Sequence, residues 1–407
     1  MLQHARAVFH ADEVKDLKSL AADKIEDIRY FDIAGMDRVA AICMCGRSGT
    51  ELVASYLDGH DDVIMLPTNR SERIYQFFEC YQSLPLRDKL IAYAIFADFF
   101  KDSFPIAPAN YYAAVNSLFE VYGHWSPEFL ESRRAFFLFL HVVYCVALGR
   151  RPRSPRPLIV YQQHRRHDEL ARRFLEDFPQ GQFIHTVRDP ITNCGRLFEQ
   201  WFKGGAVEAP GLFTAGHVIR HLTRADMPHR GMESRTLTIR FEDLHLHLEK
   251  TMRAVADWLG LPYRSSLLDS TFNGVPWVVK RGTTSWSGPR PEQAIRDSKN
   301  ISFTDRGLLF AVFKEDFVAW NYPYPSVYKY ALVRALTFIL VVLIPMKMEI
   351  ISARTFIKMR PSLRRGGFRY AIDCLVRILI CRVGVMTLLT ANFCRRLIFG
   401  IRVLEMR

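Results

Sequence analysis

The sequence predicts an α/β fold: a parallel sheet flanked by helices, with a P-loop-like phosphate cradle and a helical C-terminal extension. Three observations support this fold class. Helical stretches alternate with short apolar runs at 39–43, 63–66, 158–161, 183–187 and 235–240. The first and fourth runs each lead into a turn that carries an arginine. The last 82 residues, 326–407, contain 15 Lys or Arg and three acids, an excess of 12 out of a total net charge of +13.

The first turn predicts the phosphate cradle. Small residues let backbone amides approach an anion, and the helix that follows presents the positive end of its dipole. The glycine spacing and the lysine of GxxxxGK[ST] are absent, which disfavours ordinary ATP chemistry. A strand-to-helix turn that merely needs glycine is the alternative. The residues of this cradle are Gly46, Arg47, Ser48, Gly49, Thr50 and Glu51.

The second turn follows the run 183–187 and begins with Arg188, Asp189 and Pro190. Because the carboxyl ends of parallel strands line one crevice, we expect Arg188 to face the same cleft as Arg47. Taken singly, Asp before Pro is also a common way to start a turn.

Together, the two turns resemble the paired phosphate motifs of the sulfotransferases that use 3'-phosphoadenosine 5'-phosphosulfate (PAPS). In that family the first motif grips the 5'-phosphosulfate and the second grips the 3'-phosphate. The resemblance extends from about Val39 to about Tyr324. It includes a late strand with a Glu-Asp turn at 236–244, and a basic loop formed by Lys280, Arg281 and Gly282 with Trp286.

The resemblance also assigns a candidate base. Residues 161–164 stand where cytosolic sulfotransferases carry Lys-Thr-His, and His164 matches the catalytic histidine. An imidazole accepts a hydroxyl proton readily near neutral pH. Because His164 is flanked by charged neighbours, a solvated turn residue is the alternative, and Glu72 is then the candidate base.

Three departures from the family pattern bear on the site. The family usually has a serine eight residues after the arginine of the second motif, where this chain has Arg196. Members that act on protein tyrosine carry a glutamate where this chain has residues 67–69, Pro-Thr-Asn, which argues against a tyrosine-peptide acceptor. Gln162 replaces the lysine that precedes the histidine.

The resemblance implies sulfuryl transfer from PAPS, without a metal, to a hydroxyl or amine of a lipid, glycan or small amphiphile. Arg47 would neutralise the charge that grows on the leaving bisphosphate. Trp286 would stack on adenine, and the 3'-phosphate would be held by Arg188, Arg196, Lys280 and Arg281. The alternatives are a nucleotide kinase with a degenerate loop and a non-catalytic PAPS-fold membrane adaptor.

Composition predicts two parts. The first, residues 1–326, corresponds to the sulfotransferase domain that the resemblance implies, in which we expect the helical insert 71–149 to build the acceptor pocket or a lid. Residues 327–407 form a basic amphipathic tail for an anionic membrane surface. Packing of the tail on the body or a homodimer contact is the alternative, and its high apolar content disfavours nucleic acid. We expect a cytoplasmic protein with peripheral or monotopic membrane association, because the first residues lack an apolar run.

Overall fold

The computed structural model describes most of the chain. The described residues are 13–43, 48–66, 73–100, 106–163, 168–203, 215–216, 218–219, 222, 232–281, 284–294, 300–352 and 367–399.

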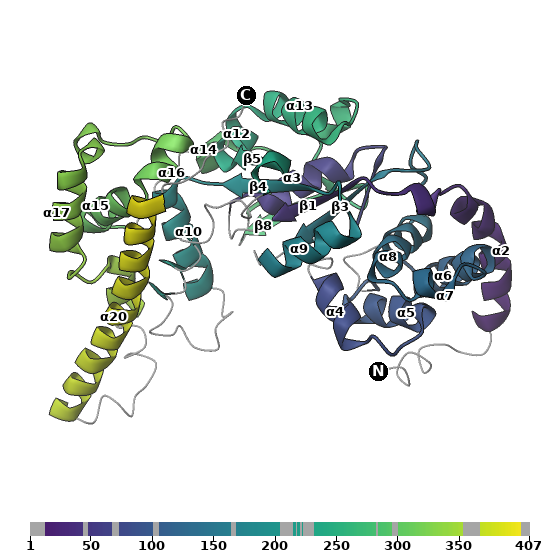
Figure 1. Ribbon diagram of the computed structural model, residues 1–407, viewed down its shortest axis with the longest axis horizontal. Helices are drawn as coiled ribbons and strands as arrows, with labels where there is room; N and C mark the ends of the chain where they lie inside the picture. Colours follow the sequence, from purple (N-terminus) through teal and green to yellow (C-terminus); the bar gives the residue numbers. More distant parts are fainter. Residues whose placement is uncertain are drawn as a thin grey trace.

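The centre of the protein is a five-stranded parallel sheet in the order β2-β3-β1-β4-β5 (Figure 1). Its strands are β1 (Val39–Cys43), β2 (Val63–Met65), β3 (Leu158–Gln163), β4 (Gln182–Val187) and β5 (Thr236–Arg240). Helices cover both faces of the sheet, so the strands read as continuous apolar runs. The predicted α/β class and all five predicted strands are confirmed.

Strand register brings the candidate loops to one edge. Cys43, the last residue of β1, pairs with Gln163 of β3 and with His185 of β4. Val187 of β4 pairs with Arg240, the last residue of β5. The segments that follow these four strands therefore leave the same edge of the sheet.

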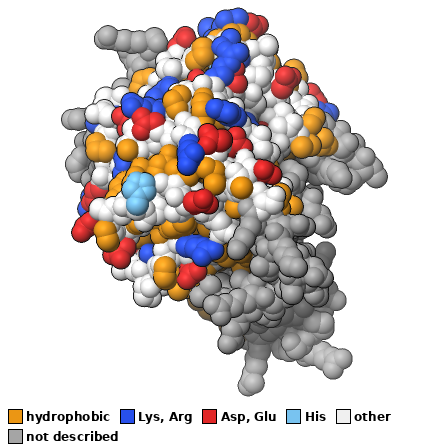
Figure 2. All heavy atoms as spheres, turned by 90° about the vertical axis from the view of Figure 1, so that its right-hand side faces the viewer, with side chains coloured by type: hydrophobic (Ala, Val, Ile, Leu, Met, Phe, Trp, Pro, Cys, Tyr) orange, Lys and Arg blue, Asp and Glu red, His pale blue; other side chains and the backbone are white. Residues whose placement is uncertain are grey.

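One face of the sheet packs against a helical lobe at the right of Figure 1. Its helices are α2 (Glu13–Arg29), α4 (Ile74–Cys80), α5 (Leu86–Phe96), α6 (Pro108–Tyr122), α7 (Pro127–Leu130), α8 (Arg133–Ala147) and α9 (Asp168–Asp177). Every residue of α8 from Ala135 onward is buried, and Ser132 caps this helix by accepting the Ala135 N–H at 3.0 Å. On the outside of the lobe, charges of both signs are interspersed (Figure 2).

The opposite face carries α3 (Thr50–Asp58) and α13 (Leu248–Leu259), with α12 (Phe241–Leu246) between β5 and α13. Gly260 ends α13 with a φ of +63°, a left-handed conformation that favours glycine. The remaining short elements are hairpin β6 (Thr271–Phe272) with β7 (Val275–Pro276), hairpin β8 (Val279–Arg281) with β9 (Thr284–Trp286), helix α14 (Pro291–Ala294), and 3₁₀ turns Ile33–Gly35, Glu233–Arg235, Ser265–Leu268 and Ser326–Lys329.

A second lobe, at the left of Figure 1, combines one helix from the middle of the chain with the C-terminal helices. They are α10 (Pro190–Lys203), α15 (Phe303–Val312), α16 (Lys314–Ala319), α17 (Ala331–Val341) and α20 (Gly367–Phe399). One apolar cluster joins Leu197 of α10 and Leu308 of α15 to Phe338 of α17 and Phe393 of α20. The helices after residue 326 therefore pack on the body of the protein. None of the helices in the described segments has both the length and the apolar content to cross a bilayer.

Candidate active site

A buried hydrogen bond joins the first predicted motif to the strand of the second. The Ser48 hydroxyl lies 2.7 Å from the Thr186 hydroxyl, and both side chains are buried. Thr186 lies on β4, two residues before Arg188. The end of the cradle is thus held against β4, at the edge where the sequence places the cleft. Gly46 and Arg47 lie outside the described residues.

Thr50 and Glu51 form the first turn of α3, whose N-terminus carries the positive end of the helix dipole. The Thr50 side chain is buried, and that of Glu51 is half-buried. A carboxylate at this position stabilises the helix but repels a phosphate. We therefore expect Glu51 to contribute its backbone N–H to an anion.

Gly49 is required by its conformation and by its neighbour. Its φ is +96°, a left-handed conformation that costs other residues about 1–2 kcal/mol. A Cβ at this position would lie 2.8 Å from Cδ2 of Phe241. Gly49 therefore lies close against the first residue of α12.

Arg188 is buried beside the same aromatic ring. Its guanidinium lies 3.8 Å from the centre of the Phe241 ring, and its Nη2 donates to the Gln293 carbonyl at 3.1 Å. Burial lowers the pKa of Arg188 to about 10, with Glu242 opposing this shift and Arg196 adding to it. The group still carries its charge at neutral pH. Stacking on an aromatic face holds the guanidinium in a fixed plane.

Glu242 anchors the turn that begins with Arg188. Its Oε1 accepts the Asp189 backbone N–H at 3.2 Å, and its Oε2 accepts the Tyr322 hydroxyl at 2.9 Å. Burial raises the pKa of the Glu242 carboxyl, and these two hydrogen bonds oppose the rise. The Glu-Asp turn was predicted from sequence, but its contacts with Asp189 and Tyr322 were not. Parallel strand ends could have placed Glu242 near Asp189, whereas Tyr322 gave no signal.

Arg196 lies on α10, in the helix that follows the Arg188 turn, and is close enough to Arg188 to lower the pKa of Arg188. It forms an ion pair with Glu199 at 3.0 Å, and Glu199 also accepts from the Asn300 side chain at 3.3 Å. The arginine at this family serine position is therefore compensated by a carboxylate one turn later on the same helix.

His245 completes the cluster around Phe241. The two ring centres are 4.5 Å apart, and His245 Nδ1 accepts the Arg290 backbone N–H at 2.9 Å. Burial, reinforced by Arg188, lowers the pKa of His245 to about 4, so the ring is neutral at pH 7. With Nδ1 accepting, the proton of the neutral ring sits on Nε2. Sequence reasoning missed this histidine because it belongs to no motif.

The predicted basic loop coincides with the β8–β9 hairpin, in which Lys280 pairs with Ser285 and Arg281 pairs with Thr284. The hairpin leads to Arg290 and α14, which contact His245 and Arg188. The chain after the hairpin thus returns to the Arg188 cluster. Gly282 lies outside the described residues, and of Lys280, Arg281 and Trp286 the structure describes the backbone alone.

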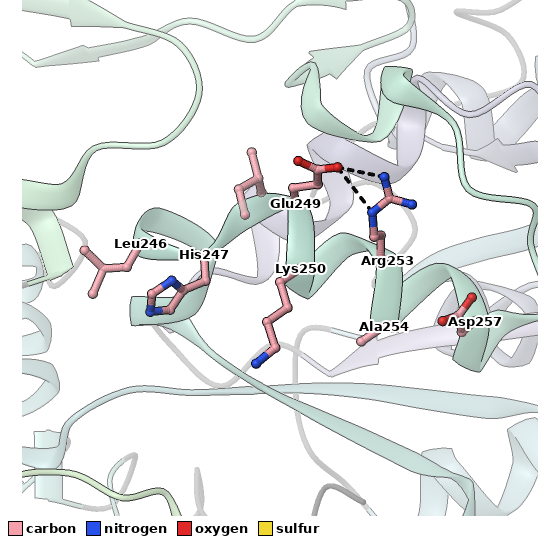
Figure 3. A pocket seen from close by; sticks show the side chains of 8 residues that line it. Leu246, His247, Glu249, Lys250, Arg253, Ala254 and Asp257 are labelled. Carbon is pink, nitrogen blue, oxygen red and sulfur yellow. Dashed lines mark hydrogen bonds and ion pairs between the residues drawn. The ribbon is translucent and has the colours of Figure 1, made fainter.

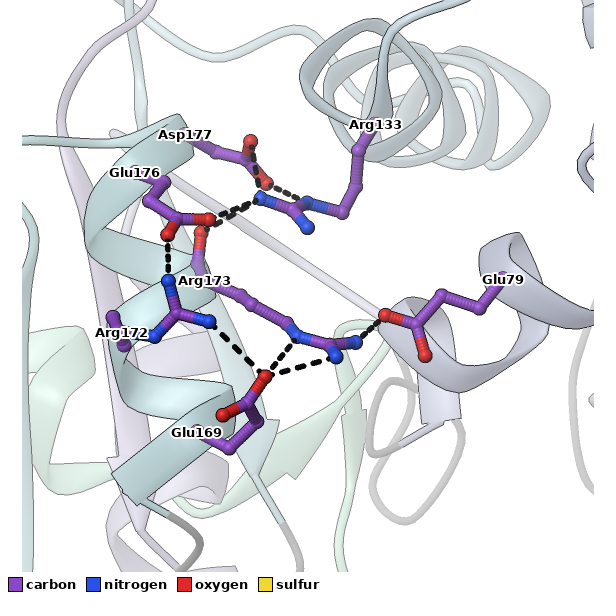
Figure 4. A network of polar contacts seen from close by, with 7 residues as sticks. All are labelled: Glu79, Arg133, Glu169, Arg172, Arg173, Glu176 and Asp177. Atoms are coloured by element: carbon purple, nitrogen blue, oxygen red, sulfur yellow. Dashed lines mark hydrogen bonds and ion pairs between the residues drawn. The ribbon is translucent and has the colours of Figure 1, made fainter.

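Both candidate bases, His164 and Glu72, lie outside the described residues. The helices that follow them, α9 and α4, are joined by a side-chain ion pair that belongs to a larger network (Figure 4). Arg173 of α9 pairs with Glu79 of α4. Arg133 of α8 binds Asp177 of α9 through two nitrogens, at 2.7 and 3.1 Å. The network comprises Glu79, Arg133, Glu169, Arg172, Arg173, Glu176 and Asp177. It holds α9 against α4 and α8.

The aromatic side chains of the helical insert form core. Tyr111 is fully buried and donates to the Leu90 carbonyl at 3.1 Å. Phe119 and Trp125 pack against Phe139 of α8. The acceptor pocket or lid assigned to 71–149 stays a prediction.

A hollow of about 650 Å³ lies on the surface of α12 and α13 (Figure 3). Lys250, Arg253 and Glu249 lie along it, and Arg253 is paired with Glu249 at 2.7 Å. The hollow includes none of the residues around Phe241. Within the described segments, no group of three or more His, Cys, Asp or Glu side chains is placed to hold a metal ion.

The chain matches the model of the sulfotransferase family over residues 41–265. The match covers more than half of the sequence, so the protein belongs to this family. Its range contains the cradle, the Arg188 turn and the Glu242 turn. No curated protein matches the chain.

Three solved structures are similar at low identity. The sulfotransferase domain from the curacin biosynthetic pathway is 16% identical, over 71% of this chain and 99% of that chain, with a TM-score of 0.41. The sulfotransferase domain from the Synechococcus PCC 7002 olefin synthase is 15% identical over 63% and 85%, with a TM-score of 0.35. A sulfotransferase from Mycobacterium avium is 14% identical over 64% and 76%, with a TM-score of 0.33.

Proposed function

We propose that this member of the sulfotransferase family transfers a sulfuryl group from PAPS to a hydroxyl group of an amphiphilic acceptor. One observation carries the proposal: the hydrogen bond between Ser48 and Thr186. It joins the end of the cradle after β1 to β4, the strand that directly precedes Arg188. A donor with phosphates at both ends of its adenosine would be bound between these two motifs.

Sulfuryl transfer resembles phosphoryl transfer, in which positioning and charge stabilisation dominate. The bond between sulfur and the 5'-phosphate oxygen breaks, and a bond from sulfur to the acceptor oxygen forms. Arg47 and the amides of the cradle would stabilise the negative charge that grows on the departing adenosine 3',5'-bisphosphate. Arg188 would bind the 3'-phosphate, which distinguishes PAPS from ATP.

The acceptor hydroxyl must lose its proton during transfer. His164 follows β3, whose last residue pairs with the last residue of β1, so its place in the sequence suits a base beside the cradle. Glu72, in the segment after β2, is the alternative base. Comparison of turnover by His164→Ala and Glu72→Ala, at equal fold stability, distinguishes the two.

The direct test is incubation of the protein with sulfate-labelled PAPS and a membrane extract, followed by mass analysis of the labelled product. We expect transfer by the wild type and by Arg253→Ala, whose arginine stacks on Tyr263 away from the site. We expect a loss of about 10²-fold in Arg188→Ala. If no extract yields a labelled product and ATP with magnesium binds more tightly than adenosine 3',5'-bisphosphate, the proposal is wrong and the protein is a nucleotide kinase.

A further inference from the structure

In α17 a charged side chain is buried and leucine side chains are exposed, which is the reverse of the usual pattern in a helix that faces water. Arg334 is turned inward and is 4% exposed. Its Nε donates to the Ala311 carbonyl at 3.0 Å, and its Nη2 pairs with Glu315 at 3.1 Å. Leu332 and Leu340, on the opposite side, are 70% and 69% exposed. Residues four apart lie on the same side of a helix, so Leu336 belongs to this exposed side as well.

The same reversal occurs in α20. Arg382 is 4% exposed and pairs with Glu349, which is also buried. Its Nη2 also donates to the carbonyl of Val342, at the end of α17. Ile380, two residues away and on the opposite side of the helix, is 56% exposed.

The two helices are fixed to each other by their inner sides. The rings of Phe338 and Phe393 stack with centres 4.6 Å apart and planes 3° from parallel. The apolar outer face of the pair is thereby presented by a packed unit, at the end of the molecule away from the N-terminal lobe (Figure 1). This outer face consists of Leu332, Leu336, Ile339 and Leu340 of α17, Leu343 and Ile344 just after α17, and Ile372, Val376, Leu379, Ile380 and Val383 of α20.

The buried ion pairs and the exposed apolar side chains both cost free energy when the protein is in water. Burial of an ion pair loses hydration that the pairing must restore, and exposed Leu or Ile side chains forgo the gain from leaving water. Soluble proteins expose such side chains singly, and a contiguous exposed set marks an interaction site. With ion pairs inside and leucines outside, the two helices suit an apolar surrounding medium.

Charge identifies that medium. Residues 326–407 contain 15 Lys or Arg against three acids. Two copies of this chain that met through the outer face would bring together two segments of the same strong charge. An anionic lipid surface, in contrast, attracts the basic residues while its acyl region takes up the leucines. We propose that the outer face of α17 and α20 binds the interfacial region of an anionic membrane, with Arg334 and Arg382 turned away from the lipid.

This docking is independent of the transfer reaction, so its test measures binding alone. The full-length protein is floated with vesicles of phosphatidylcholine, or of phosphatidylcholine with about 30% phosphatidylglycerol. Leu336→Gln combined with Leu340→Gln changes the outer face, and Leu246→Gln combined with Val318→Gln is the matched control. All four side chains are exposed, and the control pair lies on α12 and α16. We expect all three proteins to melt at the same temperature.

We expect the wild type and the control to float with the anionic vesicles, and the outer-face variant to lose at least about 10-fold in partition coefficient. Binding to neutral vesicles should be weaker for every protein. Equal flotation of the wild type and the outer-face variant overturns the proposal. So does a wild type that sediments as a dimer which the outer-face substitutions dissociate, because a second copy then covers the face.

Discussion

The hydroxyl groups of Ser48 and Thr186 lie 2.7 Å apart, although 138 positions separate them in the sequence. One precedes α3 and the other belongs to β4, so this contact holds Ser48 of the first motif beside the strand that precedes Arg188. Both side chains are buried, which makes the contact costly to break.

A double-mutant cycle measures this contact. Thr186→Val removes one partner of the buried Ser48 hydroxyl and should lower the free energy of unfolding by about 1–3 kcal/mol. Addition of Ser48→Ala should restore part of the loss, because the second polar group is then removed as well. Urea denaturation of the wild type, both single variants and the double variant gives the coupling. Strictly additive effects would show that the two hydroxyls do not interact.

The contact between Gly49 and Phe241 predicts a difference between two glycine substitutions. Gly49 and Gly274 both have positive φ, at +96° and +74°, but a Cβ on Gly274 would have no atom within 4 Å. Gly274→Ala should therefore cost only the backbone strain, about 1–2 kcal/mol. Gly49→Ala should cost about 1–3 kcal/mol more, because its methyl group overlaps Phe241. Equal shifts in the urea midpoint of the two variants would contradict this packing.

His245 predicts a pH dependence of stability. Its pKa is about 4 in the folded protein, below the ordinary 6.5 of a histidine. As pH falls from about 6.5 to about 4, the unfolded chain takes up a proton that the folded protein does not, so the free energy of unfolding decreases. His245→Gln retains an acceptor for the Arg290 N–H and should flatten this decrease. Urea denaturation at several pH values compares the two slopes, and identical slopes would contradict the burial of the ring.

His141 should also make the free energy of unfolding decrease as pH falls from about 6.5 to about 4. Burial in α8 lowers its pKa to about 4 as well, and its Nδ1 lies 2.7 Å from the Phe137 carbonyl oxygen. It lies on a helix of the N-terminal lobe, whereas His245 lies on α12. The effects of the two histidines on the slope should therefore add in a double variant.

The ion pair between Arg133 and Asp177 should be worth more than a surface pair. Asp177→Asn removes the carboxylate that binds the half-buried Arg133 guanidinium through both of its oxygens. We expect a loss of about 1–3 kcal/mol in the free energy of unfolding. Glu249→Gln is the control, because its pair with Arg253 is exposed and should contribute about 0.5 kcal/mol or less. If urea denaturation gives equal losses, this network does not hold α9 in place.

Apolar strands and strand-end turns made the sheet and the positions of Ser48 and Arg188 predictable, because parallel order fixes which edge the turns share. Contacts between distant segments were not predictable in this way. The ring of Phe241 under Arg188 and the hydroxyl of Tyr322 on Glu242 arise from packing, which leaves no spacing in the sequence.

The C-terminal arginines illustrate the same limit. The sequence predicted a basic amphipathic tail for an anionic membrane surface over residues 327–407, but not which of its arginines would be buried. In the structure, Arg334 and Arg382 are turned inward and paired with Glu315 and Glu349. The spacing of apolar and basic residues identifies the two sides of a helix. Which side is buried depends on the residues of the rest of the protein that can pair with it, here Glu315 and Glu349.

The central claim is that Arg188 binds the 3'-phosphate of a donor whose other end lies in the cradle. Calorimetric titration of Arg188→Ala with adenosine 3',5'-bisphosphate and with adenosine 5'-phosphate tests it most directly, with Arg253→Ala as the control. We expect the variant to lose about 10- to 100-fold in affinity for the bisphosphate and to keep its affinity for the monophosphate within a few-fold. Equal losses for both ligands would contradict the claim, because Arg188 would then serve the fold rather than the 3'-phosphate.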